Sequence, residues 1–112
     1  MAETGNHRAH DSDSLREEHP SGWLGLSKNE SASKIIDALL DFPPHREVNQ
    51  SELAEEAEVS RQSVSRDLDL LLEIDVIEPV SNTRPQRYRF NPESDVSQAI
   101  IQLDAAMNAA GP

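Results

Sequence analysis

Two arginines, Arg61 and Arg66, lie within the segment "EVSRQSVSRDL" at 58–68 of a chain whose formal net charge is -11. Arginine and glutamine donate hydrogen bonds in patterns that suit guanine and adenine edges, and arginine also binds phosphate. The apolar spacing of this segment predicts a helix with one buried face, formed by Val64, Leu68, Leu71 and Leu72. Polar side chains occupy its remaining surface in the first turns, namely Arg61, Gln62, Ser63, Ser65 and Arg66. We therefore expect this end of the helix to contact DNA.

A second basic segment lies at 79–92, where three arginines occur without any acidic residue, so that the segment carries a charge of +3. Together with Arg61 and Arg66 they make up half of the 10 basic residues. The predicted DNA-contacting residues of this segment are Asn82, Thr83, Arg84, Arg87 and Arg89, and Gln50 and Ser51 complete the predicted set. The competing interpretation is that the arginines form ordinary surface ion pairs with Asp67, Asp69 and Glu73, which contribute little to stability.

The overall charge argues against nucleic acid as a partner. The chain has 21 acidic and 10 basic residues, and a charge this negative repels nucleic acid at long range. However, Lys28 and Lys34 are the only lysines, and this composition resembles that of proteins from salt-loving organisms, with an archaeal source as the expectation. At molar salt the screening length falls to about 3 Å, so the local arrangement of charges decides binding.

Several kinds of chemistry are excluded or disfavoured. The sequence has no cysteine, no Gly-rich phosphate loop and no apolar run of membrane-spanning length. His7, His10 and Asp11 lie in a polar segment without neighbours to orient a metal, and His45 has no nucleophile nearby to activate. We expect a cytoplasmic protein that is not an enzyme, without metal, cofactor, membrane contact or small-molecule ligand.

The elements that would position these residues follow from apolar periodicity and capping signals. Residues 1–22 are polar and aperiodic, which predicts a disordered acidic tail. Trp23 is expected to pack as a lead-in to a first helix, which begins with a capping box formed by Ser27 and Glu30. Its buried stripe is Ile35, Ile36, Leu39 and Leu40, and it ends before Pro43 and Pro44.

Two further helices and a hairpin are expected downstream. Asn49 and Glu52 predict the start of a second helix that ends near Glu58, and Ser60 predicts the cap of the third. A turn of about three residues between these helices is typical of a helix-turn-helix. Residues 76–91 predict a β-hairpin with Tyr88 and Phe90 on its apolar face, and a last helix begins at Asn91 and Pro92.

The segment "NQSELAEEAEVSRQSVSRDLDLLLEIDVIEPV" followed by "RPQRYRF" resembles the DNA-binding core of MarR- and ArsR-like prokaryotic regulators, most of all small archaeal ones. The resemblance implies a mainly α fold with a small β-hairpin wing, a winged helix-turn-helix at 23–91 with an extra helix at 92–112. It implies a transcription regulator with recognition helix 60–74 in the major groove and wing 76–91 on the backbone or minor groove. Glu58 departs from the pattern, because glycine is usual at this left-handed turn position and a side chain costs about 1 kcal/mol there.

Two alternatives stay open. The apolar stripe of the last helix, formed by Val96, Ile100, Leu103 and Met107, either packs within its own chain or forms a homodimer interface, and we favour the homodimer. The fold could also serve as a protein-interaction module that docks onto a partner of the transcription machinery, because fold alone does not specify function.

Overall fold

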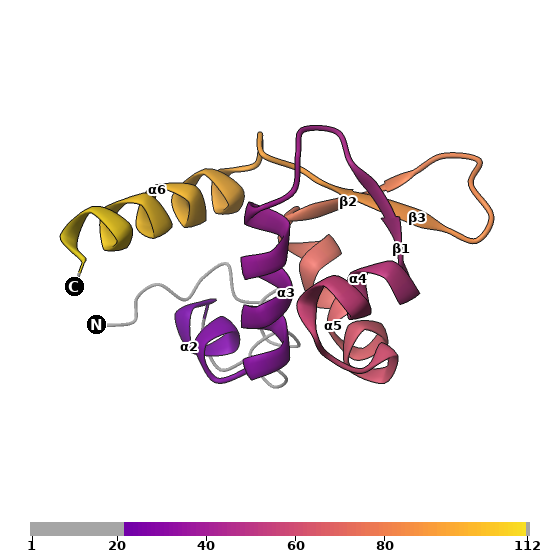
Figure 1. The fold of residues 1–112 in the computed structure, drawn as a ribbon, viewed down its shortest axis with the longest axis horizontal. Helices are drawn as coiled ribbons and strands as arrows, with labels where there is room; N and C mark the ends of the chain where they lie inside the picture. The colour runs from indigo at the N-terminus through magenta and orange to yellow at the C-terminus, as the bar shows by residue number, and fades with distance from the viewer. Residues whose placement is uncertain (1–21, 112) are drawn as a thin grey trace, which may run out of the picture.

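The described part of the chain, residues 22–111 of the computed structural model, is mainly helical and carries one small antiparallel sheet (Figure 1). Five helices and three strands occur within these residues, in the order α2 (Gly22–Ser27), α3 (Glu30–Leu40), β1 (Glu47–Asn49), α4 (Gln50–Ala57), α5 (Arg61–Glu73), β2 (Ile77–Val80), β3 (Arg87–Phe90) and α6 (Asp95–Ala110). The predicted tail, with His7, His10 and Asp11, lies outside the described residues except for Gly22, which begins α2. No helix among residues 22–111 is both long and apolar enough to cross a membrane.

The start of the first long helix differs from the prediction. Ser27 ends α2, and Asn29 rather than Ser27 caps α3 by accepting a hydrogen bond from the Ala32 N–H at 3.1 Å. The capping box at Ser27 is therefore wrong. The expectation for Trp23 is also wrong, because this residue belongs to α2 and its side chain is 66% exposed. The helix ends at Leu40, before the two prolines, as predicted.

The helix pair that follows agrees closely with the sequence. Asn49 caps α4 in a complete capping box with Glu52, and Ser60 caps α5. Between them Glu58 adopts the left-handed conformation, with φ 60° and ψ 44°. Val59 packs partly against the core, and its N–H donates to the Ala54 carbonyl at 3.0 Å. The turn thus fixes α5 relative to α4.

The sheet contains the predicted hairpin and a strand that the sequence did not reveal. β3 lies in the centre, antiparallel to both β1 and β2, with Val48 opposite Tyr88 and Ile77 opposite Phe90. Because β2 is an edge strand, Pro79 is tolerated there. β1 has three residues with a single buried one, Val48, so it carries no alternating pattern that would predict a strand.

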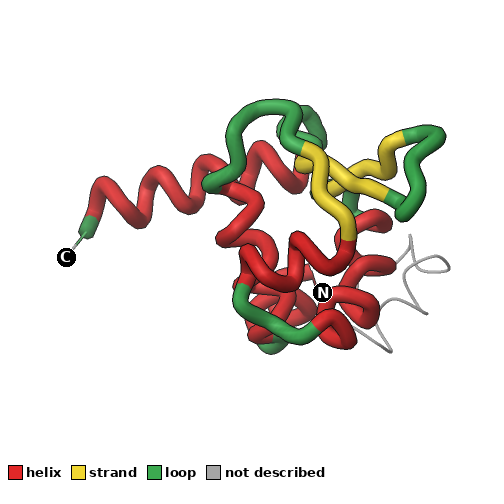
Figure 2. The backbone as a smooth tube through the Cα atoms, turned by 45° about the vertical axis from the view of Figure 1, so that its right-hand side comes forward, coloured by secondary structure: helices red, strands yellow, loops and turns green. Residues whose placement is uncertain are grey.

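One apolar core joins the helices to the sheet. Its fully buried side chains come from α3, β1, α4, α5 and β2, and they include Ile35, Leu39, Val48, Leu53, Val64, Leu71 and Ile77. Tyr88 and Phe90 of β3 pack partly against it, which confirms the predicted apolar face. Figure 2 shows the strands on one side of the helix cluster.

The last helix begins later than predicted. Ser94 caps α6, whose first residue is Asp95, so Asn91 and Pro92 precede the helix rather than starting it. From there α6 extends away from the rest of the fold (Figures 1 and 2). Val96 and Ile100 pack partly against the core of their own chain, whereas Leu103 and Met107 are 45% and 65% exposed. The predicted stripe is thus divided between two environments.

Candidate nucleic-acid interface

The first turns of α5 present polar side chains to solvent. Arg61, Gln62, Ser65 and Arg66 are exposed, as the sequence predicts. Ser63 is half-buried, and its backbone N–H donates to the Ser60 hydroxyl at 3.0 Å, so it forms part of the helix cap. Four of the five residues predicted on this helix are therefore available to a ligand at its N-terminal end.

The start of α4 lies next to this end of α5. Gln50 is half-buried, and its Nε2 donates to the Arg61 backbone carbonyl at 3.2 Å, which connects the two helix starts. Ser51 is exposed in the first turn of α4. Of the two residues predicted here, Ser51 is exposed for binding and Gln50 supports the position of Arg61.

The hairpin turn is held by its own side chains. The Thr83 hydroxyl donates to the Val80 carbonyl at 2.9 Å and accepts from the Arg87 backbone N–H at 2.9 Å, so Thr83 shapes the turn. Asn82 is exposed and has a positive φ of 61°. Arg84 is exposed and makes no ion pair or side-chain hydrogen bond with the described residues. The tip of the hairpin therefore presents Asn82 and Arg84.

The two strand arginines are neutralised by acidic residues from other elements. Arg87 bonds Glu52 at 3.0 Å and the Glu47 carbonyl at 2.8 Å, and Arg89 bonds Glu78 at 2.8 Å. The segment 79–92 contains no acidic residue, but Glu52 and Glu78 lie beside its arginines in the folded chain. Two of the three positive charges expected of this segment are therefore offset by ion pairs.

Two pKa values are shifted among these side chains, those of Glu52 and Arg89. The Asn49 backbone N–H, which donates to Glu52 at 2.8 Å, and then Arg87 hold the pKa of the Glu52 carboxyl below its usual range. The hydrogen bond from Arg89 to Glu78 raises the pKa of the Arg89 guanidinium further above neutrality. Both shifts favour the charged forms of these two side chains.

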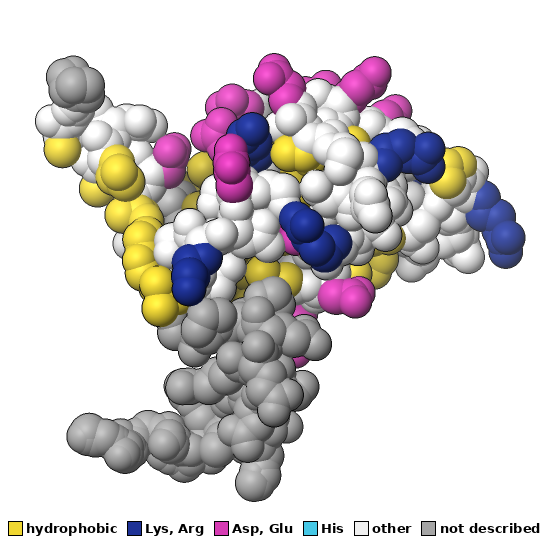
Figure 3. Space-filling model, turned by 90° about the horizontal axis from the view of Figure 1, so that it is seen from below, with side chains coloured by type: hydrophobic (Ala, Val, Ile, Leu, Met, Phe, Trp, Pro, Cys, Tyr) yellow, Lys and Arg dark blue, Asp and Glu magenta, His cyan; other side chains and the backbone are white. Residues whose placement is uncertain are grey.

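The basic side chains of residues 22–111 divide into a half-buried group and an exposed group. Among residues 22–111, the half-buried basic side chains are Arg46, Arg87 and Arg89, and each pairs with a glutamate. The exposed ones are Lys28, Lys34, Arg61, Arg66 and Arg84. Figure 3 shows basic side chains spread across the face seen from below, from the N-terminal helices to the hairpin tip, with most acidic side chains along its upper edge.

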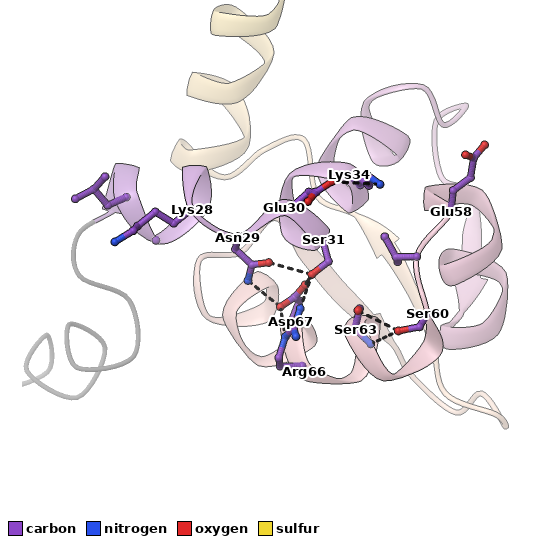
Figure 4. A pocket seen from close by; sticks show the side chains of 13 residues that line it. Lys28, Asn29, Glu30, Ser31, Lys34, Glu58, Ser60, Ser63, Arg66 and Asp67 are labelled. Carbon is purple, nitrogen blue, oxygen red and sulfur yellow. Dashed lines mark hydrogen bonds and ion pairs between the residues drawn. The ribbon is translucent and has the colours of Figure 1, made fainter.

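An open groove of about 820 Å³ lies between α2, the start of α3, the α4–α5 turn and α5 (Figure 4). Within it, the Asp67 carboxylate is 2% exposed and accepts a hydrogen bond from the Asn29 Nδ2 at 2.9 Å. Asp67 was expected as a surface ion-pair partner, and its burial corrects that expectation. Its position, three residues after Val64 and four before Leu71, falls on the apolar stripe, so the spacing held a signal that its charge obscured.

The surface ion pairs expected as the competing interpretation are present in part. Arg66 pairs with Asp67, Nε to Oδ1 at 3.3 Å. Neither Asp69 nor Glu73 forms an ion pair with the described residues. Sequence reasoning also did not place Lys28, Asn29 and Ser31 at the groove, because their proximity to α5 depends on the packing of α3.

Comparison of the chain with protein-family models, with curated proteins and with solved structures finds no match. Within residues 22–111 no group of three or more His, Cys, Asp or Glu side chains is arranged to hold a metal ion. The chemistry of this face thus rests on arginine, lysine, amide and hydroxyl donors.

Proposed function

We propose that the chain is a winged helix-turn-helix protein that binds double-stranded DNA and regulates transcription. In this proposal α5 enters the major groove, and the tip of the β2–β3 hairpin contacts the backbone or minor groove. The observation that carries the proposal is the position of the exposed arginines: Arg61 and Arg66 lie in the first turns of α5 and Arg84 at the hairpin tip, and only Arg66 of the three has an ionic partner among residues 22–111.

Different residues of this surface would have different tasks. Gln62 and Arg66 lie in the first turns of α5, where side chains reach base edges, so their loss should change the preference for particular bases. Arg84 at the hairpin tip suits a phosphate contact, which carries no sequence information. An alanine at Gln62 or Arg66 should cost about 1–3 kcal/mol on a preferred sequence, and an alanine at Arg84 should weaken all duplexes alike.

The proposal is tested by fluorescence anisotropy with a labelled pool of random duplex at moderate and high salt. The wild type should bind, and Arg61→Ala and Arg84→Ala should each weaken binding. Arg46→Ala is the matched control, because Arg46 lies outside α5 and the hairpin and pairs with Glu56 at 3.1 Å. Wild-type binding that survives both test substitutions unchanged would contradict the proposal.

A protein-docking module is the second candidate, and the neutralised Arg87 and Arg89 favour it, because they leave the hairpin strands without free positive charge. It would replace the first candidate if no duplex binds at any salt concentration.

We further propose that α6 makes the protein a homodimer. Its 16 residues contain two charged side chains, Asp95 and Asp104, and span about 24 Å. Exposed Leu103 and Met107 lie on the part that extends from the fold, and a second copy would bury them. A two-fold dimer would bind two half-sites about one helical turn apart.

A further inference from the structure

Asp67 is a buried carboxylate in the helix that we propose to enter DNA. A buried charge is costly unless hydrogen bonds and an opposite charge compensate it. Asp67 has both: it accepts from Asn29 Nδ2 at 2.9 Å, from the Ser31 hydroxyl, and from Arg66 Nε at 3.3 Å (Figure 4). Asn29 and Ser31 belong to the start of α3, so these bonds connect two helices.

The same cluster holds the guanidinium of Arg66 at a second point. Arg66 Nη2 donates to the Ser31 hydroxyl at 2.6 Å. A hydroxyl has one hydrogen and two lone pairs, so Ser31 can donate to Asp67 while it accepts from Arg66. Ser31 thereby bridges the two charged groups a second time, beside the direct contact from Arg66 Nε to Asp67 Oδ1.

Arg66 keeps donors that the cluster does not use. A guanidinium has five N–H donors, and the bonds to Asp67 and Ser31 use Nε and one Nη2 hydrogen. Three donors remain, and the side chain is 64% exposed. One edge of the guanidinium is thus fixed to the protein while another is open to a ligand.

We propose that Asp67, with Asn29 and Ser31, is a positioning residue that orients Arg66 for a two-bond contact with one base edge. The proposal rests on the DNA-binding function proposed above. A flexible arginine loses freedom on binding, whereas a fixed one has lost it during folding, so the correct base is favoured more strongly.

The charge of Asp67 has a second consequence. It offsets the charge of Arg66, so the pair adds little to the non-specific attraction of phosphates, which depends on net charge. The cluster therefore lowers the affinity for DNA of any sequence and raises the difference in affinity between the preferred sequence and others.

The experiment compares Asp67→Asn with the wild type on two duplexes: one selected from a random pool by the wild type, and a scrambled version of it. Asparagine keeps the shape but removes the charge that holds Arg66. We expect discrimination between the two duplexes to fall about tenfold. We also expect affinity for the scrambled duplex to rise, with a salt dependence steeper by about one unit in the log–log slope.

Two further variants separate positioning from charge. Asp69→Asn is the matched control, because Asp69 is exposed on the same helix and has no partner among residues 22–111. It should raise affinity for both duplexes without changing discrimination. Ser31→Ala keeps the charge of Asp67 and its direct contact with Arg66 but removes the bridging hydroxyl, so discrimination should fall while the salt slope stays unchanged.

A measurement without DNA reports on the cluster directly. The Nε–H resonance of Arg66 in the free protein should exchange slowly with water in the wild type and rapidly in Asp67→Asn. If Asp67→Asn does not fold, the discrimination between the two duplexes shown by Ser31→Ala tests the positioning role instead.

The outcomes of these experiments test the positioning role of Asp67 separately from the proposed DNA binding. Equal loss of affinity for both duplexes in Asp67→Asn, or unchanged discrimination in Ser31→Ala, would show that the cluster only stabilises the fold. If Arg66→Ala weakens the selected duplex in either case, the DNA-binding proposal stands while the positioning role falls. If the wild type binds duplex DNA but selects no sequence, only the positioning role falls; if it binds no duplex, both fall together.

Discussion

Replacing Glu58 by glycine should stabilise the protein. Glu58 ends α4 in the left-handed conformation, and its N–H donates to the carbonyls of Ala54 and Glu55. A side chain costs about 1–2 kcal/mol in this conformation, whereas glycine adopts it freely. Glycine also gains about 0.5–1 kcal/mol of freedom in the unfolded chain, so the net stabilisation from the backbone should be about 0–1.5 kcal/mol, centred on about 0.75 kcal/mol.

The charge of Glu58 adds a second, separable effect. A carboxylate at a helix C-terminus is unfavourable by about 0.3–1 kcal/mol, because the helix dipole is negative there. Glu58→Ala removes this charge and keeps a side chain in the left-handed conformation. The difference between Glu58→Gly and Glu58→Ala therefore isolates the backbone effect.

The assay is urea or thermal unfolding followed by circular dichroism. A gain of 1 kcal/mol corresponds to about 4–8 °C in melting temperature for a domain of this size. Glu55→Gly is the matched control, because Glu55 is an exposed residue inside α4, where glycine should destabilise by about 1 kcal/mol. A Glu58→Gly variant no more stable than Glu58→Ala would refute the argument from the turn.

Two other predictions concern the ion-pair network and the last helix. Glu52→Gln should be less stable than the wild type at pH 7, because the folded pKa of Glu52 is lowered. That difference is present above the ordinary glutamate pKa of about 4.3 and should vanish as the pH falls through the folded value; unfolding curves at pH 7 and pH 3 that keep the same gap would contradict it. Changing Leu103 and Met107 together to Glu should yield monomers in analytical ultracentrifugation, because the charges would lie in an apolar interface. The dimer prediction is wrong if the wild type already sediments as a monomer at high micromolar concentration.

Local rules predicted the helix pair, and long-range packing accounts for what they missed. The caps at Asn49 and Ser60 were identifiable because each lies directly before an apolar repeat. The start of α3 was placed two residues early, because serine and asparagine are both favoured at the N-cap position. Ser27 is excluded because it is the last residue of α2, which leaves Asn29 as the cap. β1 is defined by its pairing with β3, about 40 residues later, which no local pattern reports.

For the candidate site, the sequence predicted which side chains of α5 are exposed, but not the ion-pair partners of the strand arginines. Exposure of Arg61, Gln62 and Arg66 followed from the helical period. The partners of Arg87 and Arg89 did not, because Glu47, Glu52 and Glu78 come from other elements of the sheet region. Asp67 was missed for a different reason, since its spacing indicated burial while its charge indicated the surface.

This distribution of partners sets the salt dependence expected for the proposed DNA binding. If all five arginines of the helix and hairpin neutralised phosphates, the log–log slope would approach about -4.5 per chain. Arg87 and Arg89 are ion-paired and Arg66 is offset by Asp67, so Arg61, Arg84 and Lys28 are the basic residues of 22–111 without an ionic partner. Three such contacts predict a slope of about -2.7 per chain. The slope is measured by titrating DNA binding between moderate and high salt. A slope of about -4.5 would mean that DNA breaks the ion pairs of Arg87 and Arg89. A slope of about -2.7 would mean that these two arginines keep their glutamate partners on DNA, so that three basic side chains per chain make the phosphate contacts.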